Sequence, residues 1–155
     1  MNIITVNQLI PNCKLPTAQH PNQMLHDLRG KTVVLYFYPK DNTPGCTQEG
    51  KDFTQLHDAF IAANAVVLGI SRDSQAAHEK FSKKYCFPFE LISDTDSQLC
   101  KLFDVLRPKN MFGKIANMIQ RSTFVIDKHG ILRFEWRGVK VTGHAQQVLD
   151  AVKPL

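Results

Sequence analysis

The strongest constraint on the fold is a pair of continuous apolar runs separated by a helical pattern. The runs cover residues 32–38 and 65–71, and neither alternates apolar with polar side chains, which is typical of strands buried on both faces. The residues between them, from about Pro44 to Asn64, place four apolar side chains on one helical face: Phe53, Leu56, Phe60 and Ile61. A strand, a helix and a second strand in this order favour a parallel pair within an α/β sheet.

Shorter segments continue this alternation. A helix is predicted over residues 75–85, a short strand over residues 89–92 and a brief helix around Leu99. The predicted N-caps of these two helices are acidic or hydroxyl side chains: Asp73 or Ser74 for the first, and Asp94 or Asp96 for the second. A last helix is predicted to begin at Thr142 or Gly143.

Three further segments have different signatures. Strands at residues 122–126 and 131–136 flank the run Asp127–Gly130, which predicts an antiparallel hairpin. Residues 104–120 are interpreted as a polar loop, long enough to suggest a functional role. The first thirty residues contain three prolines separated by short β-like pieces, and they predict an irregular lead-in.

The resulting order, β-α-β-α-β-α-β-β-α, predicts an α/β protein with one domain over residues 1–155. The expected architecture is a thioredoxin-like sandwich with a central mixed sheet, helices on both faces and an N-terminal extension. Open α/β sheets usually place their chemistry at the carboxyl ends of central strands, so we expect the functional residues there.

Composition and charge exclude several classes of protein. A content of 43% hydrophobic and 21% charged residues is that of an ordinary globular protein. The opening residues lack the basic and apolar regions of a secretory signal, and no apolar stretch is long enough to span a bilayer. We therefore expect a cytoplasmic protein without a membrane partner. The net charge of +5 comes from scattered lysines and arginines, so a nucleic-acid partner is not predicted.

The segment Pro39–Thr47 joins the first buried run to the following helix and carries a cysteine. Thr43 is a good N-cap and Pro44 suits the first helical position, which makes Cys46 the third helical residue. Backbone N–H groups of a first helical turn lack intrahelical partners, and the helix dipole favours negative charge there. A lone cysteine is more often a buried hydrophobe, but the prolines, the threonine and Gly45 predict an exposed turn that suits a thiolate.

These residues resemble the Q-type (bacterioferritin-comigratory) subfamily of the peroxiredoxins. The signature Pro-x-x-x-Thr-x-x-Cys is matched by Pro39, Thr43 and Cys46. Supporting matches lie throughout the chain: Val67–Ser71, Pro88–Asp94 and Arg121–Asp127. The resemblance covers nearly the whole chain. It implies a thiol-dependent peroxidase that reduces hydrogen peroxide and organic hydroperoxides.

The resemblance also implies roles for individual residues. Cys46 would be the peroxidatic nucleophile, and because a free thiol with a pKa of about 8.5 is mostly protonated at neutral pH, it needs activation. Arg121 matches the arginine that stabilises the thiolate and the leaving oxygen. Thr43 would both cap the helix and bond the thiolate and peroxide oxygens; the alternative is that it only caps the helix. The backbone N–H groups of Gly45 and Cys46 would act as an oxyanion hole, and Pro39 would shield the sulfur.

Glu49 lies three residues after the cysteine, where it would either orient Arg121 or be a solvated carboxylate. The implied reaction converts the thiolate and a peroxide to a sulfenic acid and water or an alcohol. No cofactor is expected, because the O–O bond is itself the oxidant. No metal is expected either, because none of the six histidines shows metal-ligand spacing.

The residue that resolves the sulfenic acid is left open. Many relatives carry a resolving cysteine five residues after the peroxidatic one, where this chain has Lys51, and others carry it near the position of Ser82. Cys86 lies one helical turn beyond Ser82, although its neighbours suggest a buried helix end. Cys100 and Cys13 are weaker candidates. The alternative is a one-cysteine enzyme resolved by an external thiol.

Two other functions compete with the peroxidase. A thioredoxin-like thiol-disulfide oxidoreductase normally needs a Cys-x-x-Cys pair at the helix start, which this chain lacks. A non-catalytic holdase would not depend on Cys46. For the peroxidase, the resemblance implies a monomer reduced by thioredoxin or another thiol donor.

Overall fold

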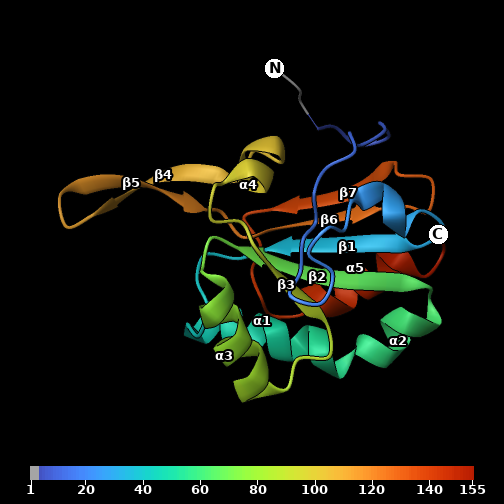
Figure 1. Cartoon of the computed structure of the whole chain (residues 1–155), viewed down its shortest axis with the longest axis horizontal. Helices are drawn as coiled ribbons and strands as arrows, with labels where there is room; N and C mark the ends of the chain where they lie inside the picture. The colour runs from blue at the N-terminus through green and yellow to red at the C-terminus, as the bar shows by residue number, and fades with distance from the viewer. Residues whose placement is uncertain (1–3) are drawn as a thin grey trace.

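A five-stranded mixed sheet forms the centre of the computed structural model, which describes residues 4–155 (Figure 1). Its strands, in spatial order, are β3 (Glu90–Ser93), β2 (Ala65–Ser71), β1 (Thr32–Phe37), β6 (Ser122–Ile126) and β7 (Leu132–Arg137). Strands β1, β2 and β3 run parallel, whereas β6 and β7 pair antiparallel. The predicted mixed sheet is confirmed. The first three residues of the predicted domain and of the opening stretch lie outside the described residues.

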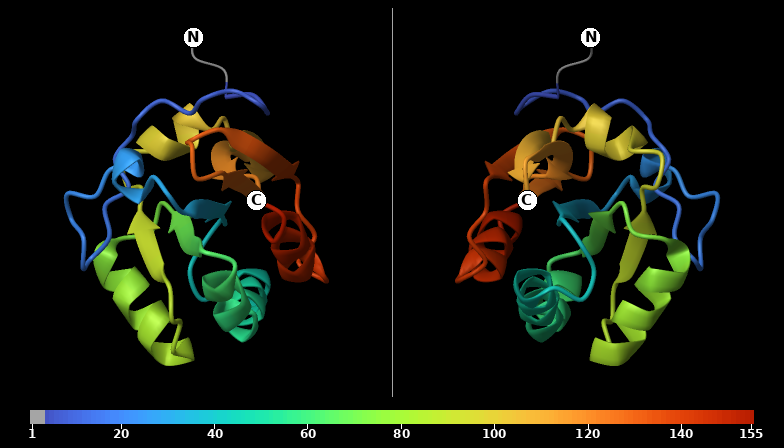
Figure 2. Two further views of the ribbon diagram at one scale, coloured as in Figure 1. Left: turned by 90° about the vertical axis from the view of Figure 1, so that its right-hand side faces the viewer. Right: turned by 90° about the vertical axis from the view of Figure 1, so that its left-hand side faces the viewer.

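Helices cover both faces of this sheet, as predicted. One face carries four helices: α1 (Pro44–Gln55), α2 (His57–Ala62), α3 (Gln75–Tyr85) and α5 (His144–Val152). The short helix α4 (Gln98–Leu102) and the N-terminal segment, with the 3₁₀ turn η1 (Leu25–Leu28), cover the other face (Figure 2).

The side chains of β1 explain why its sequence is apolar from Val33 onwards. Val33, Leu35 and Phe37 pack into the core beneath α4, whereas Val34 and Tyr36 pack into the core beneath α1 and α5. Successive strand side chains point to opposite faces. Because both faces of β1 are covered, its apolar side chains are buried in one apolar core or the other.

The predicted helix over residues 44–64 is divided in two at Leu56. Helix α1 ends at Gln55, and Leu56 has φ −98° and ψ 5° before α2 begins. The Thr54 hydroxyl donates to the Gly50 carbonyl at 2.7 Å. Such a bond competes with the backbone ladder and bends helices, which the apolar spacing of this segment does not reveal.

The interpretation of residues 104–120 as a loop is wrong. Strands β4 (Leu106–Met111) and β5 (Lys114–Ile119) form an antiparallel hairpin that projects away from the central sheet (Figure 1). Its turn residues Phe112 and Gly113 both have positive φ, at 54° and 83°, as a two-residue type I′ turn requires. Phenylalanine is an unusual first residue for that turn, and most of the hairpin is exposed, so neither turn chemistry nor apolar alternation marked it.

Most other boundaries agree with the sequence to within a residue or two. The Ser74 hydroxyl caps α3 by accepting from the Ala77 N–H at 3.2 Å. The N-cap position of α4 is Ser97 rather than Asp94 or Asp96. The Asp94 carboxylate nevertheless accepts from the Leu99 and Cys100 N–H groups of that helix. The lead-in residues 4–31 are irregular apart from η1 and isolated bridges. The predicted β6–β7 hairpin is confirmed.

Candidate active site

The turn between β1 and α1 places Cys46 at the carboxyl end of the central strand. Helix α1 begins at Pro44, with Thr43 in the extended N-cap conformation, so Cys46 is the third helical residue as predicted. The first backbone N–H groups of the helix lack intrahelical acceptors and point to this end. The site therefore lies at the edge of the sheet where parallel α/β folds place their ligands.

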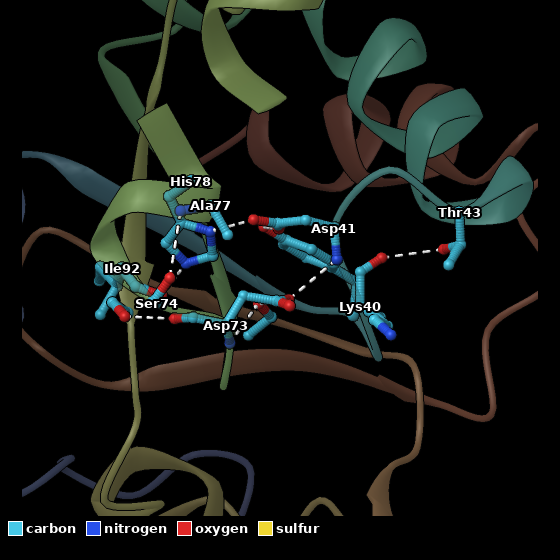
Figure 3. A network of polar contacts seen from close by, with 11 residues as sticks. Lys40, Asp41, Thr43, Asp73, Ser74, Ala77, His78 and Ile92 are labelled. Carbon is cyan, nitrogen blue, oxygen red and sulfur yellow. Dashed lines mark hydrogen bonds and ion pairs between the residues drawn. The ribbon is translucent and has the colours of Figure 1, made fainter. Parts of the chain in front are cut away.

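The Thr43 side chain does not cap the helix. Its hydroxyl donates to the Lys40 carbonyl at 2.9 Å, across the turn (Figure 3). The predicted side-chain cap is wrong: the hydroxyl is directed at the Lys40 carbonyl, and its oxygen accepts no bond from the N–H groups of the first helical turn. Its oxygen lone pairs can still accept a bond, and the bond to Lys40 stiffens the approach to α1.

The Cys46 thiol is enclosed, although the turn around it is not. The prolines and Asn42 of the turn are partly or fully exposed, but Cys46 is only 2% exposed and packs with Tyr36, Tyr38 and Phe53 in the core beneath α1. The expectation of an exposed cysteine is corrected. The reason is that the third helical side chain points back towards the sheet while the first one points out.

Arg121 joins the cysteine to Glu49. One guanidinium nitrogen donates to Cys46 Sγ at 3.4 Å, and another donates to Glu49 Oε1 at 2.6 Å. Arg121 directly precedes β6, and the pairing of Phe37 with Ser122 brings it beside the end of β1. A Cβ atom at Gly45 would lie 3.1 Å from the guanidinium, so glycine at this position leaves room for the arginine.

Glu49 is buried rather than solvated. It is 1% exposed, and its Oε2 has no hydrogen-bond partner among the described residues. Burial raises the pKa of Glu49 to about 7, and the nearby Arg121 offsets only part of that rise. Burial acts to lower the pKa of Arg121, but the negative charges of Glu49 and Cys46 outweigh it and raise that pKa. Arg121 therefore stays charged.

The other three cysteines occupy different environments, and all are free thiols. Cys86 ends α3 in the left-handed conformation, with φ 54° and ψ 46°, and is exposed. The suggested buried helix end is therefore wrong, because this C-cap turns the side chain outwards. Cys100 is buried, and Cys13 is partly buried. Burial raises the pKa of the Cys13 thiol to about 11 and also raises that of Cys100.

Sequence reasoning missed a buried polar contact behind the turn. Asp41 lies within hydrogen-bond distance of His78 on α3, and both side chains are buried. The available signal was a histidine beside Phe81 on the apolar side of a predicted helix, because a buried polar side chain requires a partner. Its partner, 37 residues away, was not visible from spacing.

Two further observations concern the described residues 4–155. No three His, Cys, Asp or Glu side chains gather there as a metal ion would require. In the same part of the chain, none of the helices has the length and apolar character needed to cross a membrane.

Comparison with known proteins gives consistent results. Residues 6–135 match the AhpC/TSA family. The chain is 47% identical over 146 residues to the putative peroxiredoxin bcp of Coxiella burnetii, covering 94% of this chain and 97% of that protein. It is 45% identical over 152 residues to peroxiredoxin Bcp of Bacillus subtilis, covering 98% and 97% of the two chains.

Solved structures are similar as well. A structure from work on the alkyl peroxide reduction activity of the Xanthomonas campestris bacterioferritin comigratory protein superposes with a TM-score of 0.86 at 46% identity, covering 92% of this chain and 90% of that one. A cysteine-to-serine mutant of Xylella fastidiosa PrxQ gives a TM-score of 0.90 at 41% identity, covering 99% and 98%.

Proposed function

This chain belongs to the AhpC/TSA family as a Bcp/peroxiredoxin Q enzyme, a thiol-dependent peroxidase, and we propose that Cys46 is its peroxidatic nucleophile. The observation that carries the proposal is the Arg121 guanidinium 3.4 Å from the Sγ of Cys46, a side chain that is only 2% exposed. A cation there favours the thiolate, which is the reactive form of cysteine.

The proposed chemistry is a displacement at the peroxide oxygen. The thiolate sulfur attacks one oxygen, an S–O bond forms as the O–O bond breaks, and the leaving hydroxide or alkoxide takes up a proton. Sulfur is oxidised to a sulfenic acid and the peroxide is reduced to water or an alcohol. Arg121 and the backbone N–H groups of Gly45 and Cys46 stabilise the charge that develops on the leaving oxygen.

The remaining site residues have supporting roles in this proposal. Glu49 positions Arg121 through the 2.6 Å contact between its Oε1 and the guanidinium. Thr43 offers its oxygen to the substrate while its proton bonds to Lys40, and Pro39 shields the sulfur at the mouth of the turn. The substrates we assign are hydrogen peroxide and organic hydroperoxides, by extension from the alkyl peroxide reduction described for the Xanthomonas relative.

Cys86 is our candidate for the resolving cysteine. Cys100 and Cys13 pack in the core on the other side of the sheet from Cys46, so the sheet separates their thiols from the sulfenic acid. The neighbours of Cys86, by contrast, contact α1: the Phe87 ring lies against Gly50, and Lys51 Nζ lies 5.2 Å from the centre of the Tyr85 ring.

In the proposed second step, the Cys86 thiol attacks the Cys46 sulfenic acid, a disulfide forms and water leaves. Because Cys46 is buried and Cys86 exposed, the active-site turn or the end of α3 must move first. A dithiol protein of the thioredoxin type then reduces the disulfide. We further propose that the 155 residues act as one cytoplasmic, monomeric peroxidase domain.

The test is intact-mass and peptide mapping of the protein before and after one equivalent of hydrogen peroxide. We expect a disulfide between Cys46 and Cys86 in the wild type, a trapped Cys46 sulfenic acid in Cys86→Ser, and no change from the wild type in the control Cys100→Ser. If Cys46 stays unmodified while peroxide is consumed, its assignment as the nucleophile is contradicted. A Cys46 sulfenic acid in the wild type that awaits external thiol would support the one-cysteine alternative.

Activity assays on the wild type and on Cys46→Ser separate the competing functions. A holdase would keep its activity in Cys46→Ser, whereas the peroxidase loses turnover completely. A thiol-disulfide oxidoreductase would reduce a disulfide substrate without consuming peroxide, because its chemistry needs no O–O bond.

A further inference from the structure

The turn that carries Cys46 is held from behind by a buried polar contact. Asp41 lies in this turn and is 8% exposed, and both of its carboxylate oxygens have partners. Oδ1 accepts from the Tyr38 hydroxyl at 2.6 Å, and Oδ2 lies 2.6 Å from Nδ1 of His78 on α3, as Figure 3 shows for the histidine.

A count of donors and acceptors fixes the protons in this contact. Nε2 of His78 lies 2.9 Å from the Ile92 carbonyl oxygen, which can only accept, so Nε2 carries a proton. Nδ1 faces the Asp41 carboxylate, and two lone pairs at 2.6 Å would repel, so a second proton lies in that contact. Because the Tyr38 hydroxyl donates to the same carboxylate, Asp41 is stabilised as the anion and His78 as the imidazolium.

The surroundings favour a cationic histidine. Asp73, in the segment between β2 and α3, accepts from the Asp41 N–H at 2.9 Å and from the Ser71 hydroxyl at 2.6 Å, so a second carboxylate lies behind the pair. Burial acts to lower the pKa of His78, but Asp41, the Ile92 carbonyl and Asp73 outweigh it and raise that pKa. The cleft that opens over the two aspartates is lined by three lysines: Lys40, Lys80 and Lys84.

We propose that His78 and Asp41 form a positioning ion pair that holds the turn 39–43 in the conformation in which Cys46 reacts with peroxide. The inference rests on the proposed role of Cys46. Asp41 precedes the N-cap of α1 by two residues, so a displacement at Asp41 is transmitted to the start of the helix and to the sulfur. Neither residue of the pair touches the reacting atoms.

A second tether from the same helix supports this reading. Asn42 has a positive φ of 61°, and its Oδ1 lies within 3.4 Å of Lys84 Nζ and 3.3 Å of the Tyr85 hydroxyl. Helix α3 therefore contacts two consecutive residues of the turn, one through the buried pair and one at the surface. Contacts with α3, in addition to the turn's own sequence, therefore hold the turn in place.

Two substitutions separate the two hydrogen bonds of the histidine. The Asn side-chain nitrogen falls near the position of Nδ1, so His78→Asn keeps a neutral donor to Asp41. The Gln nitrogen falls near the position of Nε2, so His78→Gln keeps the bond to Ile92 and leaves the Asp41 carboxylate without its donor. Both variants remove the titratable ring and the same aromatic contacts, which makes them a matched pair.

The test is the second-order rate constant for Cys46 oxidation by hydrogen peroxide, measured by stopped flow over a range of pH. We expect His78→Gln to be about tenfold to a hundredfold slower than the wild type, because small displacements at a reacting centre have effects of that size. His78→Asn stays within a few-fold. The wild-type rate should fall by the same few-fold as pH rises through the raised pKa of His78, because the neutral ring, like asparagine, can still donate to Asp41. Both variants should lack this alkaline limb.

Nitrogen-detected NMR of the histidine rings in the reduced wild-type protein gives an independent readout. We expect both His78 nitrogens to have shifts of the protonated type at pH 7. An unprotonated Nδ1, or a His78→Gln variant with the wild-type rate and pH profile, would overturn the proposal. If Cys46 itself proved unreactive, the proposed function would fail, while the NMR spectrum would still report on the ion pair.

Discussion

Arg121 is the residue on which the proposed reactivity of Cys46 depends most. Its guanidinium has to meet the Cys46 sulfur and the Glu49 carboxylate at once, at 3.4 Å and 2.6 Å. The planar guanidinium can donate to both from different nitrogens, whereas the ammonium of a lysine is a single point of charge and cannot reproduce this arrangement. Glu49 depends on Arg121 in turn, because its buried carboxylate has no other hydrogen-bond partner within the described residues.

We predict that Arg121→Lys lowers the second-order rate constant with hydrogen peroxide by about a hundredfold, the usual effect of losing one positioned donor to a developing charge. Stopped-flow oxidation of Cys46 measures this directly. Arg107→Lys, in the β4–β5 hairpin, is the control and should react at the wild-type rate. A wild-type rate for Arg121→Lys would mean that charge alone, without geometry, activates the sulfur.

The raised pKa of Glu49 predicts that the stability of the protein depends on pH. That pKa is about 7 in the folded protein, against an ordinary value of 4.5, so the folded state binds more protons than the unfolded state between these values. Stability therefore falls as pH rises through this window. Because Glu49→Gln cannot ionise, it should be more stable than the wild type at pH 8 and about equal at pH 4.5.

Urea unfolding at pH 4.5 and pH 8 tests this prediction. The matched control is Glu79→Gln on the exposed side of α3, which should leave the pH dependence of the wild type unchanged. Equal stabilities of Glu49→Gln and the wild type at both pH values would contradict a raised pKa for this carboxyl.

At the scale of elements, the packing of α3 against α1 connects Cys46 with Cys86, the proposed nucleophile and the proposed resolving cysteine. Phe87 follows α3 and lies against Gly50 of α1, where a Cβ atom would overlap the ring. Glycine lowers helix propensity, so its presence within α1 is explained by this close approach. The same junction places Cys86 next to the helix of Cys46.

Gly50→Ala should therefore destabilise the protein despite the higher helix propensity of alanine. We expect a loss of about 1–3 kcal/mol in the free energy of unfolding, the usual cost of overpacking, measured by urea denaturation. Gln55→Ala, at an exposed position of the same helix, serves as the control. A more stable Gly50→Ala would show that Phe87 can move aside freely.

For the whole molecule, the buried histidine of α5 limits stability in acid. His144 is 4% exposed, and its Nε2 lies 2.8 Å from the Thr123 hydroxyl beneath the sheet. Burial, together with the charge of Arg121, lowers its pKa from 6.5 to about 4. The unfolded state binds more protons between these values, so stability falls as pH falls from about 6.5 to 4.

We predict that His144→Gln, which keeps a nitrogen to bond Thr123, weakens this acid destabilisation. The midpoint of urea unfolding, measured from pH 7 to pH 4, should depend less on pH in the variant than in the wild type. His129→Gln, in the exposed β6–β7 turn, is the control. An unchanged acid slope in His144→Gln would assign the acid sensitivity to other groups.

The sequence by itself determined the order of the elements of the central sheet, although not the β4–β5 hairpin, and it singled out the turn that carries Cys46. Unbroken apolar runs, helical spacing and cap residues are local properties, and they placed β1, β2, α3 and Cys46 correctly. The match over Arg121–Asp127 also identified Arg121 as a candidate, although only through its resemblance to a family.

Only the tertiary structure decided which side chains are enclosed and which of them meet. Cys46 is buried and Cys86 exposed, the reverse of what their neighbours suggested, because burial depends on what packs over a residue. Arg121 lies 75 residues from Cys46 in the chain, and His78 lies 37 residues from Asp41. Such contacts depend on strand register and helix packing across the whole sheet, and local preferences carry no information about them.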